Sequence, residues 1–212
     1  MEIMELVHQK RAAANHEVNI NGVNITTTVA DASWLINSFI NELRPSLYDG
    51  NIDKKRVIGL DIEWNSNSND NNDKVATLQL CYGDRCIIIQ LLHLDLIPFA
   101  LSTLLIDQSI SFVGVGITED LSKLECDYGL ESVPGIELGQ LADKVLGKQQ
   151  FSGSGLVELA CEIVGLSIEK PASASCSDWG LKNLTSEQIK YATIDAYASF
   201  VIGSKLLEGG NN

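Results

Sequence analysis

Val57-Ile58-Gly59-Leu60-Asp61-Ile62-Glu63 is the stretch that decides the fold. Its apolar residues predict a strand that ends in two acids. Residues two apart in a strand face the same side, so Asp61 and Glu63 point together. Two carboxylates at the end of an apolar strand repel each other and are costly without a compensating cation. Taken alone, the pattern fits a strand that emerges into solvent, and in company with further acids it predicts a divalent-metal site.

Two more strands are expected after this stretch. The sequence predicts strands at Arg56–Glu63, Val75–Tyr82 and Cys86–Leu91, with a tight turn at Gly83-Asp84 and a polar loop at Asn65–Asp73. Tight turns join antiparallel neighbours, whereas the helical crossovers expected later in the chain join parallel strands. The fold class predicted is α/β: a mixed sheet with three antiparallel strands followed by parallel strands, flanked by helices.

The segment before this sheet carries turn and helix signals. Asn21-Gly22 lies between two alternating runs and predicts a hairpin over Val18–Val29 with a type I′ turn. Asp31 is in a position to cap the helix that follows, and Pro45 is expected to end that helix.

A second acidic motif follows a buried strand in Phe112–Asp120. We expect Thr118 to cap a helix there, with Asp120 in its first turn. The acid could simply complement the helix dipole. Gly114 and Gly116 also give a G-x-G pattern, but Glu119 occupies the place of the third glycine of a dinucleotide fingerprint.

The third motif lies in the final predicted helix, which begins with a capping box at Thr185 and Gln188. Tyr191 and Asp195 are four residues apart and share one helix face. That face is otherwise apolar, so Asp195 needs a partner. A local hydrogen bond between the two side chains is the simplest interpretation of this motif alone.

Composition narrows the choice of function. The 212 residues carry a formal net charge of −13, which argues against a broad basic nucleic-acid surface. Five cysteines without a CxxC pair predict reduced, buried thiols in a cytoplasmic or nuclear protein. We expect no secretory signal and no membrane span.

The three motifs together resemble the DEDDy 3′→5′ exonucleases of the ribonuclease H-like superfamily. The match runs from Arg56 to Leu207 and includes Cys176-Ser177-Asp178-Trp179. Within the group, the chain is similar to the exonuclease domain of the Werner helicase and to its small stand-alone plant relatives. The resemblance implies a DnaQ-like fold and one exonuclease domain over residues 1–212, with a core at about 18–207 and terminal tails at 1–17 and 208–212.

The resemblance also implies roles for the acids. Asp61, Glu63 and Asp195 would hold one Mg²⁺ or Mn²⁺, and Asp61 with Asp120 a second ion about 4 Å away. One ion would activate a water and the other would stabilise the leaving 3′ oxygen, with Tyr191 orienting the water. The implied reaction hydrolyses phosphodiester bonds from the 3′ end of single-stranded nucleic acid and releases nucleoside monophosphates.

Two tryptophans, and one position at which this sequence differs from its relatives, bear on how the substrate would be bound. Trp64 follows Glu63 and could stack on a terminal base or support the strand from behind, whereas Trp179 is expected to be structural. Relatives often have an aromatic residue where this chain has Ser122. The motifs do not separate RNA from DNA, and we expect RNA because a small stand-alone cytosolic enzyme fits RNA trimming.

The sequence leaves two alternative functions open and suggests that the protein has binding partners. A catalytically inactive nuclease-like module that binds nucleic acid or protein is the main alternative, and an oxidoreductase would rest on Gly114 and Gly116 alone. An acidic enzyme with a weak intrinsic hold on its substrate suggests a homo-oligomer or a guiding partner, of Argonaute type or another kind. No membrane partner is expected.

Overall fold

The computed structural model describes residues 14–50, 55–65 and 73–209. Its centre is a mixed seven-stranded sheet in the order β1-β2-β5-β4-β3-β6-β7. Strands β3, β4 and β5 are antiparallel neighbours, and β6 and β7 continue the sheet in parallel with β3, which confirms the predicted fold class. The strand bounds are β1 Ala14–Ile20, β2 Val23–Ala30, β3 Arg56–Trp64, β4 Val75–Tyr82, β5 Arg85–Gln90, β6 Ile110–Gly114 and β7 Ile136–Glu137.

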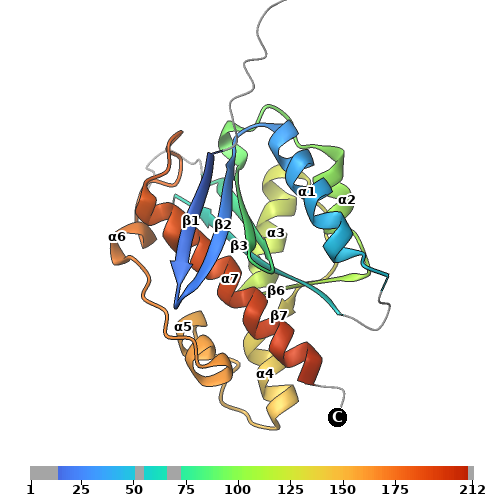
Figure 1. The fold of residues 1–212 in the computed structure, drawn as a ribbon, viewed down its shortest axis with the longest axis vertical. Coiled ribbons are helices and arrows are strands. Elements are labelled where there is room, and N and C mark those ends of the chain that lie inside the picture. The colour runs from blue at the N-terminus through green and yellow to red at the C-terminus, as the bar shows by residue number, and fades with distance from the viewer. Residues whose placement is uncertain (1–13, 51–54, 66–72, 210–212) are drawn as a thin grey trace, which may run out of the picture.

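Helices cover both faces of this sheet. One face carries α1, α2 and α3, and the other carries α4, α5 and the long α7, which runs across the strands (Figure 1). The bounds of the helical elements are α1 Ser33–Leu47, η1 Leu91–His93, α2 Phe99–Leu105, α3 Ile117–Tyr128, α4 Leu138–Leu146, α5 Leu156–Leu159 with a π-helical extension η2 at Ala160–Val164, α6 Ala172–Ser175 and α7 Ser186–Gly209.

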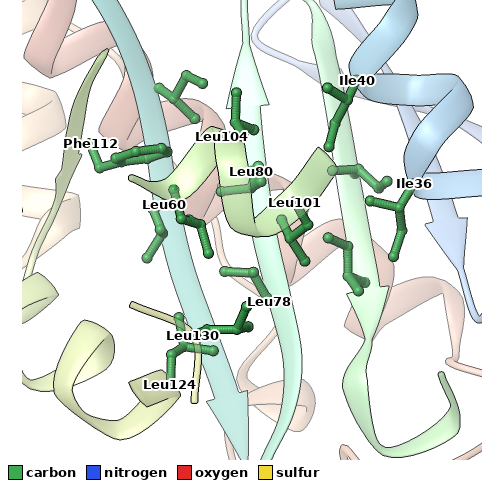
Figure 2. Close-up of a cluster of buried hydrophobic side chains, with 14 of the residues drawn as sticks. Ile36, Ile40, Leu60, Leu78, Leu80, Leu101, Leu104, Phe112, Leu124 and Leu130 are labelled. Atoms are coloured by element: carbon green, nitrogen blue, oxygen red, sulfur yellow. The ribbon is translucent and has the colours of Figure 1, made fainter. Parts of the chain in front are cut away.

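The alternation of side chains along β3 separates two apolar cores. Ile58, Leu60 and Ile62 belong to the core beneath α1, α2 and α3. Figure 2 shows Leu60 in this core beside Leu78 and Leu80 of β4. The intervening residues of β3 face the opposite side, where α7 lies. Since successive residues of a strand alternate between faces, Gly59, Asp61 and Glu63 are directed toward α7.

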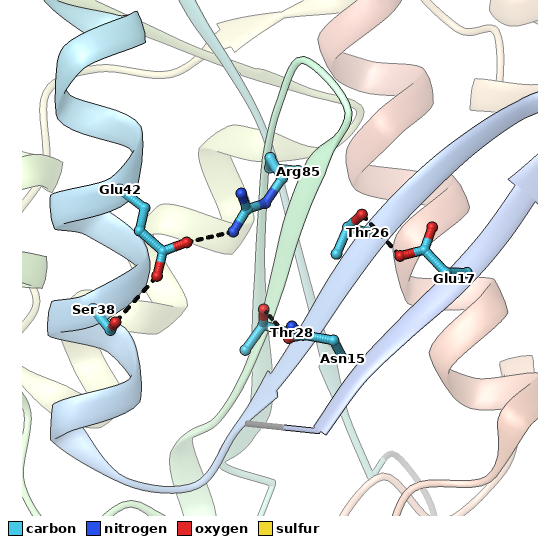
Figure 3. Close-up of polar contacts among 7 residues, drawn as sticks. All are labelled: Asn15, Glu17, Thr26, Thr28, Ser38, Glu42 and Arg85. Atoms are coloured by element: carbon cyan, nitrogen blue, oxygen red, sulfur yellow. Dashed lines mark hydrogen bonds and ion pairs between the residues drawn. The ribbon is translucent and has the colours of Figure 1, made fainter. Parts of the chain in front are cut away.

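The predicted hairpin is confirmed and extends the sheet. Asn21 and Gly22 have φ values of 50° and 88°, as a type I′ turn requires. Threonine hydroxyls of β2 donate hydrogen bonds to side chains of β1: Thr26 to Glu17 at 3.0 Å and Thr28 to Asn15 at 2.9 Å (Figure 3). The other edge of β2 pairs in parallel with β5. Since β1 begins at Ala14 and pairs with β2, residues 14–17, expected to belong to the N-terminal tail, are part of the sheet.

Helix α1 corrects two expectations. Asp31 does not cap it: the helix begins at Ser33, whose N–H and hydroxyl donate to Asp95 at 2.7 and 3.0 Å, and Asp31 pairs with Lys182. Pro45 does not end it, because the helix continues to the buried Leu47. The start of α1 depends on Asp95, which is distant in sequence, and the last turn of the helix is held by the burial of Leu47 in the core.

Two further predictions are wrong. Thr118 is not a cap, since α3 starts one residue earlier and Gly116, at φ 75°, turns the chain into the helix. Cys81 and Cys86 are buried, but the remaining three cysteines, at 126, 161 and 176, are exposed, and all five are free thiols. Within the described ranges, no helix has the length and hydropathy needed to cross a membrane.

Candidate active site

The close contact between β3 and α7 builds the site. A Cβ placed on Gly59 would lie 2.0 Å from the carbonyl oxygen of Ala196 and 2.6 Å from the backbone nitrogen of Phe200. Only a residue without a side chain lets the helix backbone rest on the strand at this point. The contact brings Asp195, which precedes Ala196, against Asp61, two residues beyond Gly59 on the same face of β3.

Three carboxylates meet where β3 and α7 touch. Asp61, Glu63 and Asp195 each offer an oxygen, and these oxygens lie within 4.8 Å of one another. Asp195 is 4% exposed. The helix that carries it, α7, begins with the predicted capping box, in which Thr185 and Gln188 exchange hydrogen bonds. The structure therefore assembles three of the predicted acids into one cluster.

The fourth predicted acid approaches from α3. Asp120 lies in the first turn of that helix, is 8% exposed, and is near enough for its charge to raise the pKa values of Asp61 and Glu63. It does not share the 4.8 Å cluster. Asp120 thus borders the other three acids.

The start of α3 does not fit a dinucleotide site. Both carboxylate oxygens of Glu137 accept the N–H of Gly116, at 2.9 and 3.0 Å. A pyrophosphate would need such free N–H groups at the helix N-terminus. Gly114 instead serves packing, because a Cβ there would meet the Leu60 carbonyl oxygen at 2.7 Å.

Burial and mutual repulsion raise the pKa values of the acids. Burial raises the pKa of Asp61 well above its usual range, and the charges of Asp195, Glu63 and Asp120 raise it further. Burial and Asp195 raise the pKa of Glu63 to about 8, while burial and the neighbouring Glu137 and Glu119 raise that of Asp120 to about 7. Burial raises the pKa of Asp195 to about 6, against the lowering effect of Lys170. The folded site favours protons, or another cation, on its carboxylates.

Lys170 is a member of the site that the sequence motifs did not indicate. Its ammonium lies 2.7 Å from Oδ2 of Asp195 and 4.0 Å from the centroid of the Tyr191 ring. Lys170 belongs to the irregular segment between η2 and α6, and no spacing rule relates it to α7. The local Tyr191–Asp195 hydrogen bond considered for this motif is replaced by a cation in contact with both side chains.

Of the two tryptophans considered in the sequence, Trp64 is exposed and Trp179 is buried. Trp64 is 38% exposed at a register shift between β3 and β4, and its ring centroid lies 5.9 Å from the ammonium of Lys123. Trp179 is 1% exposed and packs on Tyr191 with ring centroids 6.0 Å apart, which confirms its structural assignment.

Asn65 is a second residue that the motifs missed. Its amide donates to Asp178 at 2.6 Å and its oxygen accepts the N–H of Trp179 at 2.7 Å. The end of β3 is thereby tied to the loop that precedes α7.

The donor set fits divalent cations. Oδ2 of Asp61 and Oδ1 of Asp195 are buried and have no hydrogen-bond partner. Buried polar atoms are almost always paired, so two orphaned carboxylate oxygens in one acidic cluster fit a site for a divalent cation. Oxygen-only donors are those that Mg²⁺ and Mn²⁺ prefer.

A mixed sheet with a carboxylate cluster between β3 and α7 defines the class as an α/β fold with a candidate metal site. Comparison with known proteins gives the family. The 3′-5′ exonuclease family profile matches residues 31–209, and the chain belongs to this family.

Two relatives agree with the assignment to the 3′-5′ exonuclease family. The chain is 33% identical to the mouse bifunctional 3′-5′ exonuclease/ATP-dependent helicase WRN over 80% of its length, and 34% identical to an Arabidopsis thaliana 3′-5′ exonuclease over 68%. It spans only 12% and 50% of those two proteins.

Two solved structures resemble the fold. Escherichia coli RNase D, an exoribonuclease involved in structured RNA processing, superposes with a TM-score of 0.69 over 86% of the chain and 44% of its own, at 23% identity. The EXD2 exonuclease domain soaked in Mn and GMP gives 0.50 at 28% identity, over 86% of the chain and 90% of its own.

Proposed function

We propose that the chain is a metal-dependent 3′→5′ exonuclease that removes nucleoside monophosphates from single-stranded nucleic acid, with RNA preferred to DNA. One observation carries the proposal: Asp61, Glu63 and Asp195 present oxygens within 4.8 Å of one another, and two of their buried oxygens lack partners. Membership of the 3′-5′ exonuclease family supports the polarity. The EXD2 domain, which was soaked with manganese and a mononucleotide, supports the choice of metal and product.

The acids divide between two ion positions in this proposal. Asp61, Glu63 and Asp195 would hold one ion, and Asp61 with Asp120 a second one, which agrees with the position of Asp120 beside the cluster. When bound, the divalent ions supply the charge that favours deprotonation of an attacking water and stabilises the leaving 3′ oxygen.

The remaining residues act on water and substrate. Tyr191 lies one helical turn before Asp195 on the same face of α7, where its hydroxyl would orient the attacking water. Trp64 is exposed beside Glu63, so its ring would stack on the terminal base. Because the formal charge is −13, we also propose that a second copy or a partner protein helps to hold the nucleic acid.

A degradation assay tests the function. Single-stranded RNA and DNA of one sequence, labelled at the 5′ end, are incubated with Mg²⁺, Mn²⁺ or EDTA. We expect a descending ladder with either metal, none in EDTA, and faster loss of the RNA. Circular strands and the Asp61→Asn variant should show no cleavage. An intact linear strand at saturating metal would favour the inactive binding module, and cleavage of a circle would contradict the exonuclease assignment.

A further inference from the structure

Lys170 contributes a cation at the position where a metal ion would contact Asp195. Its ammonium donates to Oδ2 of Asp195 at 2.7 Å, the Lys170 side chain is 22% exposed, and Asp195 is almost fully buried. The chain reaches this point through the irregular stretch that ends at Pro171, before α6. The buried carboxylate of Asp195, a member of the acidic cluster, is therefore paired with a lysine that has no role in the proposed reaction.

The ammonium satisfies the cluster only in part. It takes one oxygen of Asp195 and leaves Oδ1 of Asp195 and Oδ2 of Asp61 without partners. One positive charge acts on three carboxylates, those of Asp61, Glu63 and Asp195. A divalent ion with several open coordination positions would satisfy these oxygens more completely than one ammonium group.

The ammonium and the ion cannot share Oδ2 of Asp195 at low cost. Two cations held by the same oxygen repel each other strongly in a buried site, where the effective dielectric constant is low. A lysine side chain has a flexible four-carbon stem, so its head can withdraw toward solvent without movement of the backbone. The partial exposure of Lys170 gives it a direction in which to withdraw.

We propose that Lys170 is a placeholder cation, which neutralises Asp195 in the metal-free protein and is displaced when a divalent ion binds. The inference rests on the proposed function, since it needs a metal site. In the metal-free state, the same ammonium lies over the Tyr191 ring and keeps the Tyr191–Asp195 face of α7 packed against the cluster. Lys170 would then act as a positioning residue that sets the metal concentration at which the site fills.

A permanent structural ion pair makes a different forecast. If Lys170 and Asp195 stay paired with metal bound, Lys170→Met removes a stabilising contact from the metal-bound form as well, so the melting temperature falls at saturating Mn²⁺ as it does in EDTA. If the ammonium is displaced, its removal destabilises only the metal-free form. The affinity for metal then rises, because the ion no longer has to break the pair.

The experiment measures Mn²⁺ affinity by calorimetry, and thermal stability both in EDTA and at saturating Mn²⁺, where the placeholder reading expects Lys170→Met to melt as the wild type does. It compares the wild-type protein with Lys170→Met, Lys170→Arg and Lys205→Met at pH 8. We expect Lys170→Met to bind Mn²⁺ about tenfold more tightly, the size of one charge-assisted hydrogen bond, and to melt at a lower temperature in EDTA. Lys170→Arg keeps the charge and should stay near wild type. Lys205→Met removes the same charge from an exposed position on α7 and should change neither quantity.

If the Lys170→Met variant fails to fold, the proposal can still be tested by a measurement on Lys170 in the wild-type protein. In wild-type protein labelled at lysine Nζ, the Lys170 signal should shift on addition of Mg²⁺, while the Lys205 signal should not. An unchanged Lys170 signal with Mg²⁺ bound, or an unchanged or weaker Mn²⁺ affinity of Lys170→Met, would overturn the placeholder. Failure of the wild-type protein to bind Mn²⁺ would instead refute the proposed function.

Discussion

Substitution of Gly59 by alanine should disrupt the site without touching any acid. The new methyl group would lie 2.0 Å from the Ala196 carbonyl oxygen and 2.6 Å from the Phe200 nitrogen, both of which are α7 backbone. Ordinary contact begins near 3.4 Å, so α7 has to move about 1.4 Å away from β3. Backbone atoms cannot rotate aside as a side chain does, and Asp195 would move with the helix.

The expected effects are a loss of stability and a larger loss of activity. Overpacking of this kind costs about 1–3 kcal/mol, which for a chain of this size lowers the melting temperature by roughly 2–12 °C. A displacement near 1 Å in a catalytic constellation lowers the rate by about 10²-fold. Mn²⁺ affinity should fall as well, because Asp61 and Asp195 would no longer share an ion at their present separation.

Gly153→Ala provides the matched control. It introduces the same methyl group at an exposed turn where no atom lies within 4 Å, and its φ is not in the left-handed region. Melting temperature, Mn²⁺ affinity and cleavage rate are measured on both variants. A Gly59→Ala protein with wild-type values for all three would refute the argument that the close approach of β3 and α7 builds the site.

Three further outcomes are expected. In EDTA, the free energy of unfolding should fall as the pH rises from about 5 to 8. The raised pKa values of Glu63 (about 8) and Asp120 (about 7) mean that the folded protein binds more protons than the unfolded one in this range. Chemical denaturation at several pH values measures this free energy, and a rise between about pH 5 and 8 would contradict the prediction. Tyr191→Phe should slow single-turnover cleavage by about 10²–10⁴-fold and leave Mn²⁺ affinity intact, whereas a wild-type rate would remove the hydroxyl from the mechanism. Trp64→Ala should weaken binding of single-stranded RNA about tenfold if the ring stacks on a base, with Trp34→Ala as a control of equal exposure on α1; equal affinities of the two variants would leave Trp64 with a structural role.

The strands and the acids could be predicted because their signals are local. The alternation in β3 determines which face Asp61 and Glu63 occupy, and the Asn21-Gly22 pair determines the hairpin turn. The four-residue spacing of Tyr191 and Asp195 places both on one face of α7. Each inference needed only neighbouring residues and the geometry of one element.

The features that the sequence did not reveal depend on contacts over long distances in the chain. Lys170 enters the site from an irregular segment, where no periodicity indicates the direction of a side chain. The start of α1 depends on Asp95, which is 62 residues away from Ser33. The pairing of β2 with β5 likewise depends on tertiary packing, because a hairpin carries no signal for the sheet edge that it will join.

The packing of α7 also has a consequence for how the protein is made. The helix contacts six strands of the sheet, from β1 to β6, and it supplies Tyr191 and Asp195 to a site whose other acids precede it along the chain. Pairings between such distant segments form late, because a long loop must close first. On a ribosome, the strands emerge first and expose an apolar face until α7 has been synthesised, a stage at which nascent chains are prone to aggregate. The emerging polypeptide therefore has no assembled acidic cluster while its strands are being made, and α7 completes both the core and the cluster when it packs against them.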